Sequence, residues 1–149
     1  MKKKDTHRFF IVLLVQLLTT VGFAQNPELL KDISPYEGSN PSNFTLFKDK
    51  VYFIALERAN SISITSALWV TDGTAPGTSR VKACSPFMRF SDQPMVVAND
   101  LMFFPGYDAG NGQELWVSDG TENGTRMVKN INPSGNTRFE ELIAFKGKL

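Results

Sequence analysis

Short, mainly apolar runs separated by polar turns follow one another along most of the chain. Two groups share this pattern, at residues 44–47, 48–50 and 51–56 and again at residues 95–98, 99–100 and 101–104. Apolar runs of this length on either side of a short polar turn are typical of β-hairpins. Outside the N-terminus, no window longer than a few residues has helical spacing. The pattern therefore predicts an all-β fold.

One phrase of the sequence occurs twice. Residues 67–78 read ALWVTDGTAPGT and residues 114–125 read ELWVSDGTENGT, so that Trp69 and Trp116 stand 47 residues apart. Each copy leads into a Val-Lys pair, and the similarity extends to three Lys-x-x-x-Pro segments, at 31–35, 82–86 and 129–133. A constant period of this size indicates a repeat architecture.

These similarities divide the chain into two units and the start of a third. The hairpin segment recurs as well, in an alignment of residues 47–51, 97–101 and 145–149. We expect the units to cover about residues 29–82, 83–129 and 130–149. Because the sequence ends directly after the hairpin turn of the third unit, we also expect it to be a fragment of a longer protein.

Each unit has the size of one propeller blade. Known blades place four strands in about 40–50 residues, which matches the period found here. Residues 51–56 are apolar almost throughout, as expected of a strand that is covered on both faces. We therefore expect propeller-like blades of four short antiparallel strands in an incomplete array. A β-sandwich and an open β-solenoid space their strands in a similar way and remain alternatives.

The repeated phrases resemble the Glu-Leu-Trp-x-x-Asp-Gly-Thr (ELWxxDGT) repeat family of secreted bacterial proteins. Residues 114–125 match this motif fully, whereas Ala67 stands where the family has Glu and Cys84 where its tail has an aliphatic residue. The resemblance covers nearly all of the chain after Glu28. It implies an exported array of propeller-like blades, in a family without an established activity. A structural role is expected for the shared positions: Trp69, Asp72, Gly73, Thr74, Gly77, Thr78, Glu114, Trp116, Asp119, Gly120, Thr121, Gly124 and Thr125.

The first 24 residues have the pattern of a secretory signal peptide. Lys2, Lys3, Lys4 and Arg8 precede an apolar core over residues 9–18, and Gly22-Phe23-Ala24 provides small residues for a signal peptidase. A membrane anchor is the alternative, but so short a core is insufficient to cross about 30 Å of hydrocarbon as a helix. We expect cleavage after Ala24, no membrane span afterwards, and a secreted or cell-surface protein.

The charge of the remaining chain excludes one class of partner. Residues 25–149 keep 12 of the 16 basic and 14 of the 15 acidic residues, a net charge of −2, and contain no basic block. Nucleic acid and anionic membranes therefore have no electrostatic support as partners. Cys84 is the single cysteine, so an internal disulfide is impossible, and its apolar repeat position predicts a buried residue rather than a reactive thiol.

Most catalytic machinery is absent from the sequence. His7 is the only histidine and lies in the expected leader, which leaves no residue for Ser-His-Asp or Cys-His catalysis or for His-based metal sites. A Gly-Lys-Ser/Thr phosphate loop is missing, and Gly106, Gly110 and Gly112 lack dinucleotide-binding spacing. We therefore expect no catalytic and no cofactor-binding residues in this chain.

The repeated carboxylates and tryptophans are expected to be structural. Asp72 and Asp119 occupy equivalent positions, whereas a catalytic acid and base must differ in their environments. Trp69 and Trp116 could stack on sugars, but their positions inside apolar strands favour burial in the core.

The best metal candidate is a polar loop of the second unit. Asp108, Asn111 and Glu114 could present oxygen atoms to calcium. However, their spacing is not that of an EF-hand loop, and the first unit has Arg58-Ala59-Asn60 at this place. We therefore favour a plain polar loop and keep calcium as a weaker alternative.

Two functions remain compatible with the sequence. The first is an exported structural or binding module that presents loops to a cell surface, a polysaccharide or a protein, next to further repeats of the same chain. The second is the N-terminal part of a carboxylate-based hydrolase or lyase whose catalytic residues lie outside this chain.

Overall fold

All regular elements of the described structure are β-strands. The structure, a computed structural model, describes residues 29–58, 60, 64–85 and 95–149. One sheet contains β1 (Ser42–Phe47), β2 (Lys50–Arg58), β3 (Ile64–Thr71) and β4 (Ser79–Ser85), and the other contains β5 (Val96–Ala98), β6 (Leu101–Asp108), β7 (Gly112–Ser118) and β8 (Arg126–Met127). The all-β prediction is confirmed for these residues, in which no helix long and apolar enough to cross a membrane occurs. The expected leader, residues 1–24, lies outside them.

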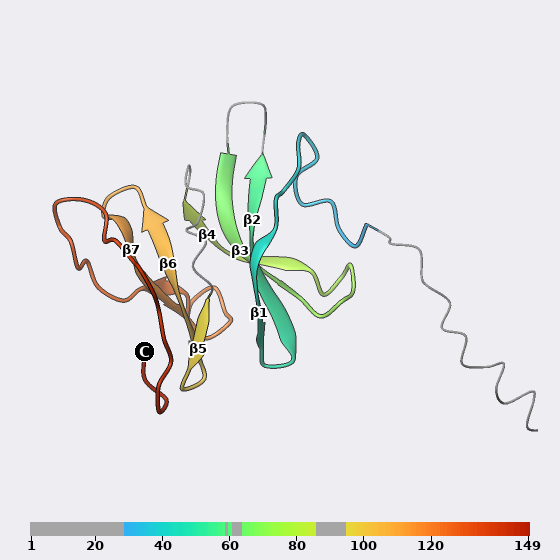
Figure 1. Cartoon of the computed structure of the whole chain (residues 1–149). Helices are drawn as coiled ribbons and strands as arrows, with labels where there is room; N and C mark the ends of the chain where they lie inside the picture. Colours follow the sequence, from blue (N-terminus) through green and yellow to red (C-terminus); the bar gives the residue numbers. More distant parts are fainter. Residues whose placement is uncertain (1–28, 59, 61–63, 86–94) are drawn as a thin grey trace, which may run out of the picture.

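Both sheets have the same simple topology. Strands that follow one another in the sequence pair antiparallel, in the orders β1-β2-β3-β4 and β5-β6-β7-β8 (Figure 1). Each unit of the repeat thus supplies one four-stranded sheet, and β4 of the first sheet contacts β6 of the second.

The first hairpin turn of each sheet contains two residues. Lys48-Asp49 have φ angles of 49° and 59°, and Asn99-Asp100 have 52° and 59°. Positive φ at both central residues is characteristic of a type I′ turn, whose twist matches that of the flanking strands. Lys146-Gly147, with φ of 49° and 73°, form a third turn of this kind under the bridge between Phe145 and Lys148.

The hairpin alignment expected from the sequence is therefore wrong by one residue. Pairing of Phe47 with Lys50 and of Ala98 with Leu101 makes Phe47 and Ala98 structural equivalents, whereas residue similarity had aligned Phe47 with Val97. The turn type decides this register, because the two positive φ angles fix which residues face each other.

Alternation along β2 buries both faces of the first sheet. Tyr52 and Ile54 belong to a core cluster that continues into the second sheet: Phe47, Tyr52, Ile54, Leu68, Val70, Val81, Cys84, Met95, Met102, Phe104 and Trp116. Phe53 and Ala55 point to the other face, where they pack with Ala67 and Trp69 and against Ile33 of the N-terminal segment. The prediction of a strand covered on both faces is confirmed.

Each sheet consequently has two different faces. We call the face that carries Trp69 or Trp116 the Trp face and the other one the opposite face. Within the chain, the opposite face of the first sheet packs on the Trp face of the second, where Phe104 lies directly across from Trp116.

Candidate functional site

The repeated DGT motif forms two exposed loops with the same internal structure. Loop 1, residues 72–78, connects β3 to β4, and loop 2, residues 119–125, connects β7 to β8. In loop 1, Asp72 Oδ1 accepts hydrogen bonds from Thr74 N at 2.9 Å and from Thr74 Oγ1 at 2.7 Å. Thr74 Oγ1 in turn accepts from Gly77 N at 2.9 Å, and Thr78 Oγ1 donates to Thr74 O at 2.7 Å.

Loop 2 repeats this network bond for bond. Asp119 Oδ1 accepts from Thr121 N at 2.8 Å and from Thr121 Oγ1 at 2.7 Å. Gly124 N donates to Thr121 Oγ1 at 3.0 Å, and Thr125 Oγ1 donates to Thr121 O at 2.5 Å. The side chains of the motif thus satisfy the backbone of their own loop, which is the common role of Asp and Thr in tight turns.

The glycines of the motif are explained by the same geometry. Gly73 and Gly120 have φ of 89° and 95°, a conformation that strains a residue with a Cβ. A Cβ on Gly77 would lie 1.9 Å from Asp72 Oδ1, and one on Gly124 would lie 2.0 Å from Asp119 Oδ1. The carboxylate therefore occupies the space that the second glycine leaves free.

The carboxylates of Asp72 and Asp119 lie in equivalent electrostatic environments. Hydrogen bonds from the hydroxyl and then from the amide of Thr74 lower the pKa of Asp72, and those from Thr121 lower the pKa of Asp119. Lys48, whose Nζ donates to Asp119 O at 3.2 Å, lowers the pKa of Asp119 further. Two acids shifted in the same direction by the same donors do not form an acid–base pair.

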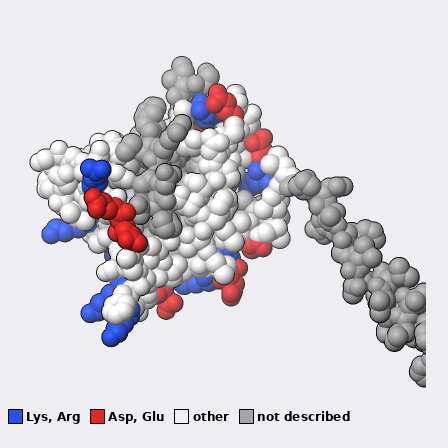
Figure 2. Space-filling view, in the orientation of Figure 1, with Lys and Arg blue, Asp and Glu red and all other residues white. Residues whose placement is uncertain are grey.

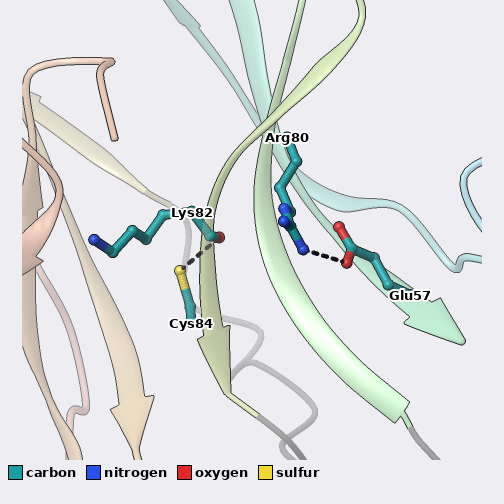
Figure 3. A network of polar contacts seen from close by, with 4 residues as sticks. All are labelled: Glu57, Arg80, Lys82 and Cys84. Atoms are coloured by element: carbon teal, nitrogen blue, oxygen red, sulfur yellow. Dashed lines mark hydrogen bonds and ion pairs between the residues drawn. The ribbon is translucent and has the colours of Figure 1, made fainter. Parts of the chain in front are cut away.

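A lysine from the preceding segment holds each loop. Lys31 Nζ donates to Thr78 O of loop 1 at 2.8 Å, and Lys82 Nζ donates to Glu122 O of loop 2 at a longer 3.5 Å. A β-bulge in the pairing of β3 with β4 lets Lys82 and Arg80 point to opposite faces, although they are only two residues apart. Figure 3 shows Arg80 directed at Glu57, whereas Lys82 extends toward the second sheet.

The loop tips differ while their scaffold is constant. Ala75-Pro76 in loop 1 and Glu122-Asn123 in loop 2 fill the two variable positions of the motif, and all four residues are exposed. The bonds described above involve no side chain of these four residues, and of their backbone atoms they use only Glu122 O, which accepts from Lys82. A ligand could therefore contact the tips without disturbing the scaffold.

The candidate calcium ligands are engaged by donors of the protein. Asp108 Oδ1 accepts from Gly110 N at 2.8 Å and from Asn111 N at 2.7 Å, and Asn111 Nδ2 lies 3.0 Å and 2.9 Å from the two carboxylate oxygens. Asn111 Oδ1 accepts from Asn130 Nδ2 at 2.8 Å. Within the described ranges, no three or more His, Cys, Asp or Glu residues are grouped to hold a metal ion.

Glu114 binds the segment that follows β8 in the sequence. Its fully buried carboxylate accepts hydrogen bonds from Ile131 N at 3.1 Å, Asn132 N at 2.9 Å and Thr137 Oγ1 at 2.7 Å. Burial raises the pKa of Glu114, but these donors outweigh burial and the pKa is lowered. The motif marked Glu114 as structural, but nothing in the sequence pointed to its partners. The first unit has Ala67 at this position and lacks the interaction.

The tryptophans and the cysteine lie in the core. Trp69 and Trp116 are both buried, and their indole Nε1 atoms have no hydrogen-bond partner among the residues that the structure describes. Cys84 is also buried, and this burial raises the pKa of its thiol to about 11. Its Sγ donates to Lys82 O at 3.3 Å (Figure 3). These observations agree with core positions rather than with sugar stacking or a reactive thiol.

Two open cavities that the sequence did not predict lie beside the tryptophans. One of about 450 Å³ is lined by Ile33, Glu57, Arg58, Thr65, Trp69 and Arg80. The other, of about 250 Å³, is lined by Thr65, Ala83, Cys84, Tyr107, Asp108, Ala109 and Trp116. Comparison of the chain with protein-family models, curated proteins and solved structures gives no match.

Proposed function

We propose that this chain is an exported repeat module of the ELWxxDGT type that presents its DGT loops to a polysaccharide or protein at the cell surface. The observation that carries the proposal is the combination of a constant loop scaffold with different exposed tips. Loops 1 and 2 share every internal side-chain bond but present Ala75-Pro76 in one case and Glu122-Asn123 in the other. Recognition elements are commonly built in this way, as variable residues on a rigid frame.

The sheet topology supports propeller-like blades as the architecture of the module. Each unit forms a four-stranded up-and-down sheet, and successive sheets pack a Trp face on an opposite face. Propeller blades have this strand order, whereas immunoglobulin-type sandwiches use Greek-key connections. The mixed charges on the face seen in Figure 2 are consistent with a partner other than nucleic acid.

Export is tested by the N-terminus of the protein recovered from outside the cells of a bacterial host. Intact-mass analysis should give a chain that begins at Gln25 or within a few residues of it, because signal peptidase reads the small residues before that position. A protein that still begins at Met1 and stays with the membrane fraction would contradict the proposal.

Loop presentation is tested by binding to a panel of soluble polysaccharides and to purified cell-surface proteins of the source. The variants Glu122→Lys and Asn123→Lys change only the tip of loop 2, so we expect weaker binding at an unchanged melting temperature. Asp119→Asn is the matched scaffold variant and should lower both together. Binding that is indifferent to both variants, or no binding by the folded protein, would count against presentation by loop 2.

A further inference from the structure

The interface between the two sheets shows what each face of a sheet is built to contact. The opposite face of the first sheet covers the Trp face of the second, and the residues at this contact are buried. Because the two sheets are repeats, the Trp face of the first sheet and the opposite face of the second are the two halves of the same kind of interface. Both of these halves lie at the ends of the pair.

The Trp face of the first sheet retains exposed apolar surface. The structural equivalents Phe44 and Met95 both belong to their Trp face, and Phe44 stacks on Phe53 with ring centroids 5.5 Å apart. Met95, which the first sheet covers, is 5% exposed, whereas Phe44 is 61% exposed. The difference corresponds to the contact that a preceding sheet would make.

Two apolar side chains on the opposite face of the second sheet are exposed in the same way. Val81 and Cys84 of β4 are 8% and 2% exposed, because the second sheet covers them. Their equivalents Val128 and Ile131 are 42% and 52% exposed.

The N-terminal segment that contains Lys31 and Ile33 makes, on the Trp face of the first sheet, the contacts that β4 makes on the Trp face of the second. Lys31 reaches loop 1 and Ile33 packs beside Trp69, as Lys82 reaches loop 2 and Cys84 lies beside Trp116. Residues 31–34 thus take the place beside Trp69 that residues 82–85 hold beside Trp116. Residues 129–133 are the third segment of this kind, and they lie at the open end of the second sheet.

We propose that a second copy of this chain docks head to tail, with the Trp face of its first sheet on the opposite face of the second sheet. Residues 129–133 of one copy then take the place of residues 31–35 of the other copy beside Trp69, and that segment moves aside. The interface is heterologous, because the two copies contribute different faces. Every assembly therefore keeps an unpaired Trp face at one end and an unpaired opposite face at the other end, and it grows with concentration. This association stands on the interface geometry and is independent of what the DGT loops bind.

The test uses one variant for each half of the interface. Phe44→Asp damages the Trp face and Ile131→Asp damages the opposite face, and both side chains are exposed, so that folding should be preserved. We expect the unaltered exported protein to gain mass with concentration in sedimentation equilibrium and each variant alone to remain monomeric. An equimolar mixture of the two variants retains one intact pair of faces and should form a dimer that does not grow further. Asn123→Asp adds the same charge outside both faces and should associate like the unaltered protein.

Each other outcome overturns the proposal. An unaltered protein that is monomeric at all concentrations has no such interface. Association of either variant alone points to a symmetric contact through one face. Loss of association in both variants without dimers in their mixture indicates unspecific adhesion of apolar surface. Circular dichroism and a urea titration of every variant establish that the compared proteins are folded.

Discussion

Replacement of Gly77, the second glycine of loop 1, by alanine should destabilise the protein through a clash with one neighbour, Asp72. A Cβ on Gly77 would lie 1.9 Å from Asp72 Oδ1 and would force the carboxylate away from Thr74. The φ angle of Gly77 lies outside the strained positive region, so the alanine backbone is acceptable in itself. The loss consists of the two hydrogen bonds from the amide and the hydroxyl of Thr74.

The expected magnitude follows from these two bonds. Each contributes about 0.5–1.5 kcal/mol net, so that displacing the carboxylate costs about 1–3 kcal/mol. Alanine also reduces the freedom of the unfolded chain, which offsets about 0.4–1 kcal/mol. Gly77→Ala should therefore lower the free energy of unfolding by up to about 2.6 kcal/mol. Asp72→Ala alone loses the same bonds and should destabilise the protein for the same reason.

A double-mutant cycle separates this mechanism from a general effect of alanine. In the Asp72→Ala background the obstacle is absent, so adding Gly77→Ala should cause no further loss. Urea titrations followed by tryptophan fluorescence give the four free energies, since both tryptophans are buried in the folded state. Gly135→Ala is the matched control, because a Cβ there meets nothing within 4 Å, and it should stay within about 0.5 kcal/mol. Additive losses for Gly77→Ala and Asp72→Ala would refute the mechanism.

Three further outcomes test the core and the buried carboxylate. Trp69→Ala and Trp116→Ala should each cost about 3–5 kcal/mol in the same titration, and full stability of either variant would contradict its core position. The Cys84 thiol, with its pKa raised to about 11, should react with Ellman's reagent at pH 8 only when the protein unfolds, and rapid labelling of the folded protein would disprove its protection. The pKa of Glu114 is lower in the folded than in the unfolded state, so its stabilisation is present above about pH 4.3 and is lost as the pH falls through the folded pKa. Glu114→Gln should reduce this loss of melting temperature in acid, and an unchanged acid profile would show that Glu114 does not contribute to it.

Loop geometry and strand class could be predicted from the sequence because their causes are local. The hydrogen bonds within each DGT loop join residues at most four apart, as between Thr74 and Thr78, so the repeated phrase contains almost all the information needed for the internal structure of the loop. The almost continuous apolar run at residues 51–56 likewise predicts that β2 is a strand covered on both faces. The burial of the repeated tryptophans could be inferred from their place inside apolar strands.

Other features depend on partners far away in the sequence. Glu114 accepts hydrogen bonds from groups 17 to 23 residues downstream, in a segment without regular structure. No pattern in the sequence indicates these donors. The hairpin register depends on paired positive φ angles, which residue similarity does not reveal. The bulge that directs Arg80 and Lys82 to opposite faces arises from the pairing of β3 with β4.

The sequence by itself determined that this chain is a repeat of β-strands joined by self-bonded DGT loops. Only the tertiary structure decided which face of one sheet covers which face of the next, and hence which faces retain exposed apolar side chains. The physical reason is that alternation gives every strand two sides without saying what lies against them. The difference in exposure between Cys84 and its equivalent Ile131 exists only because one sheet is packed on the other.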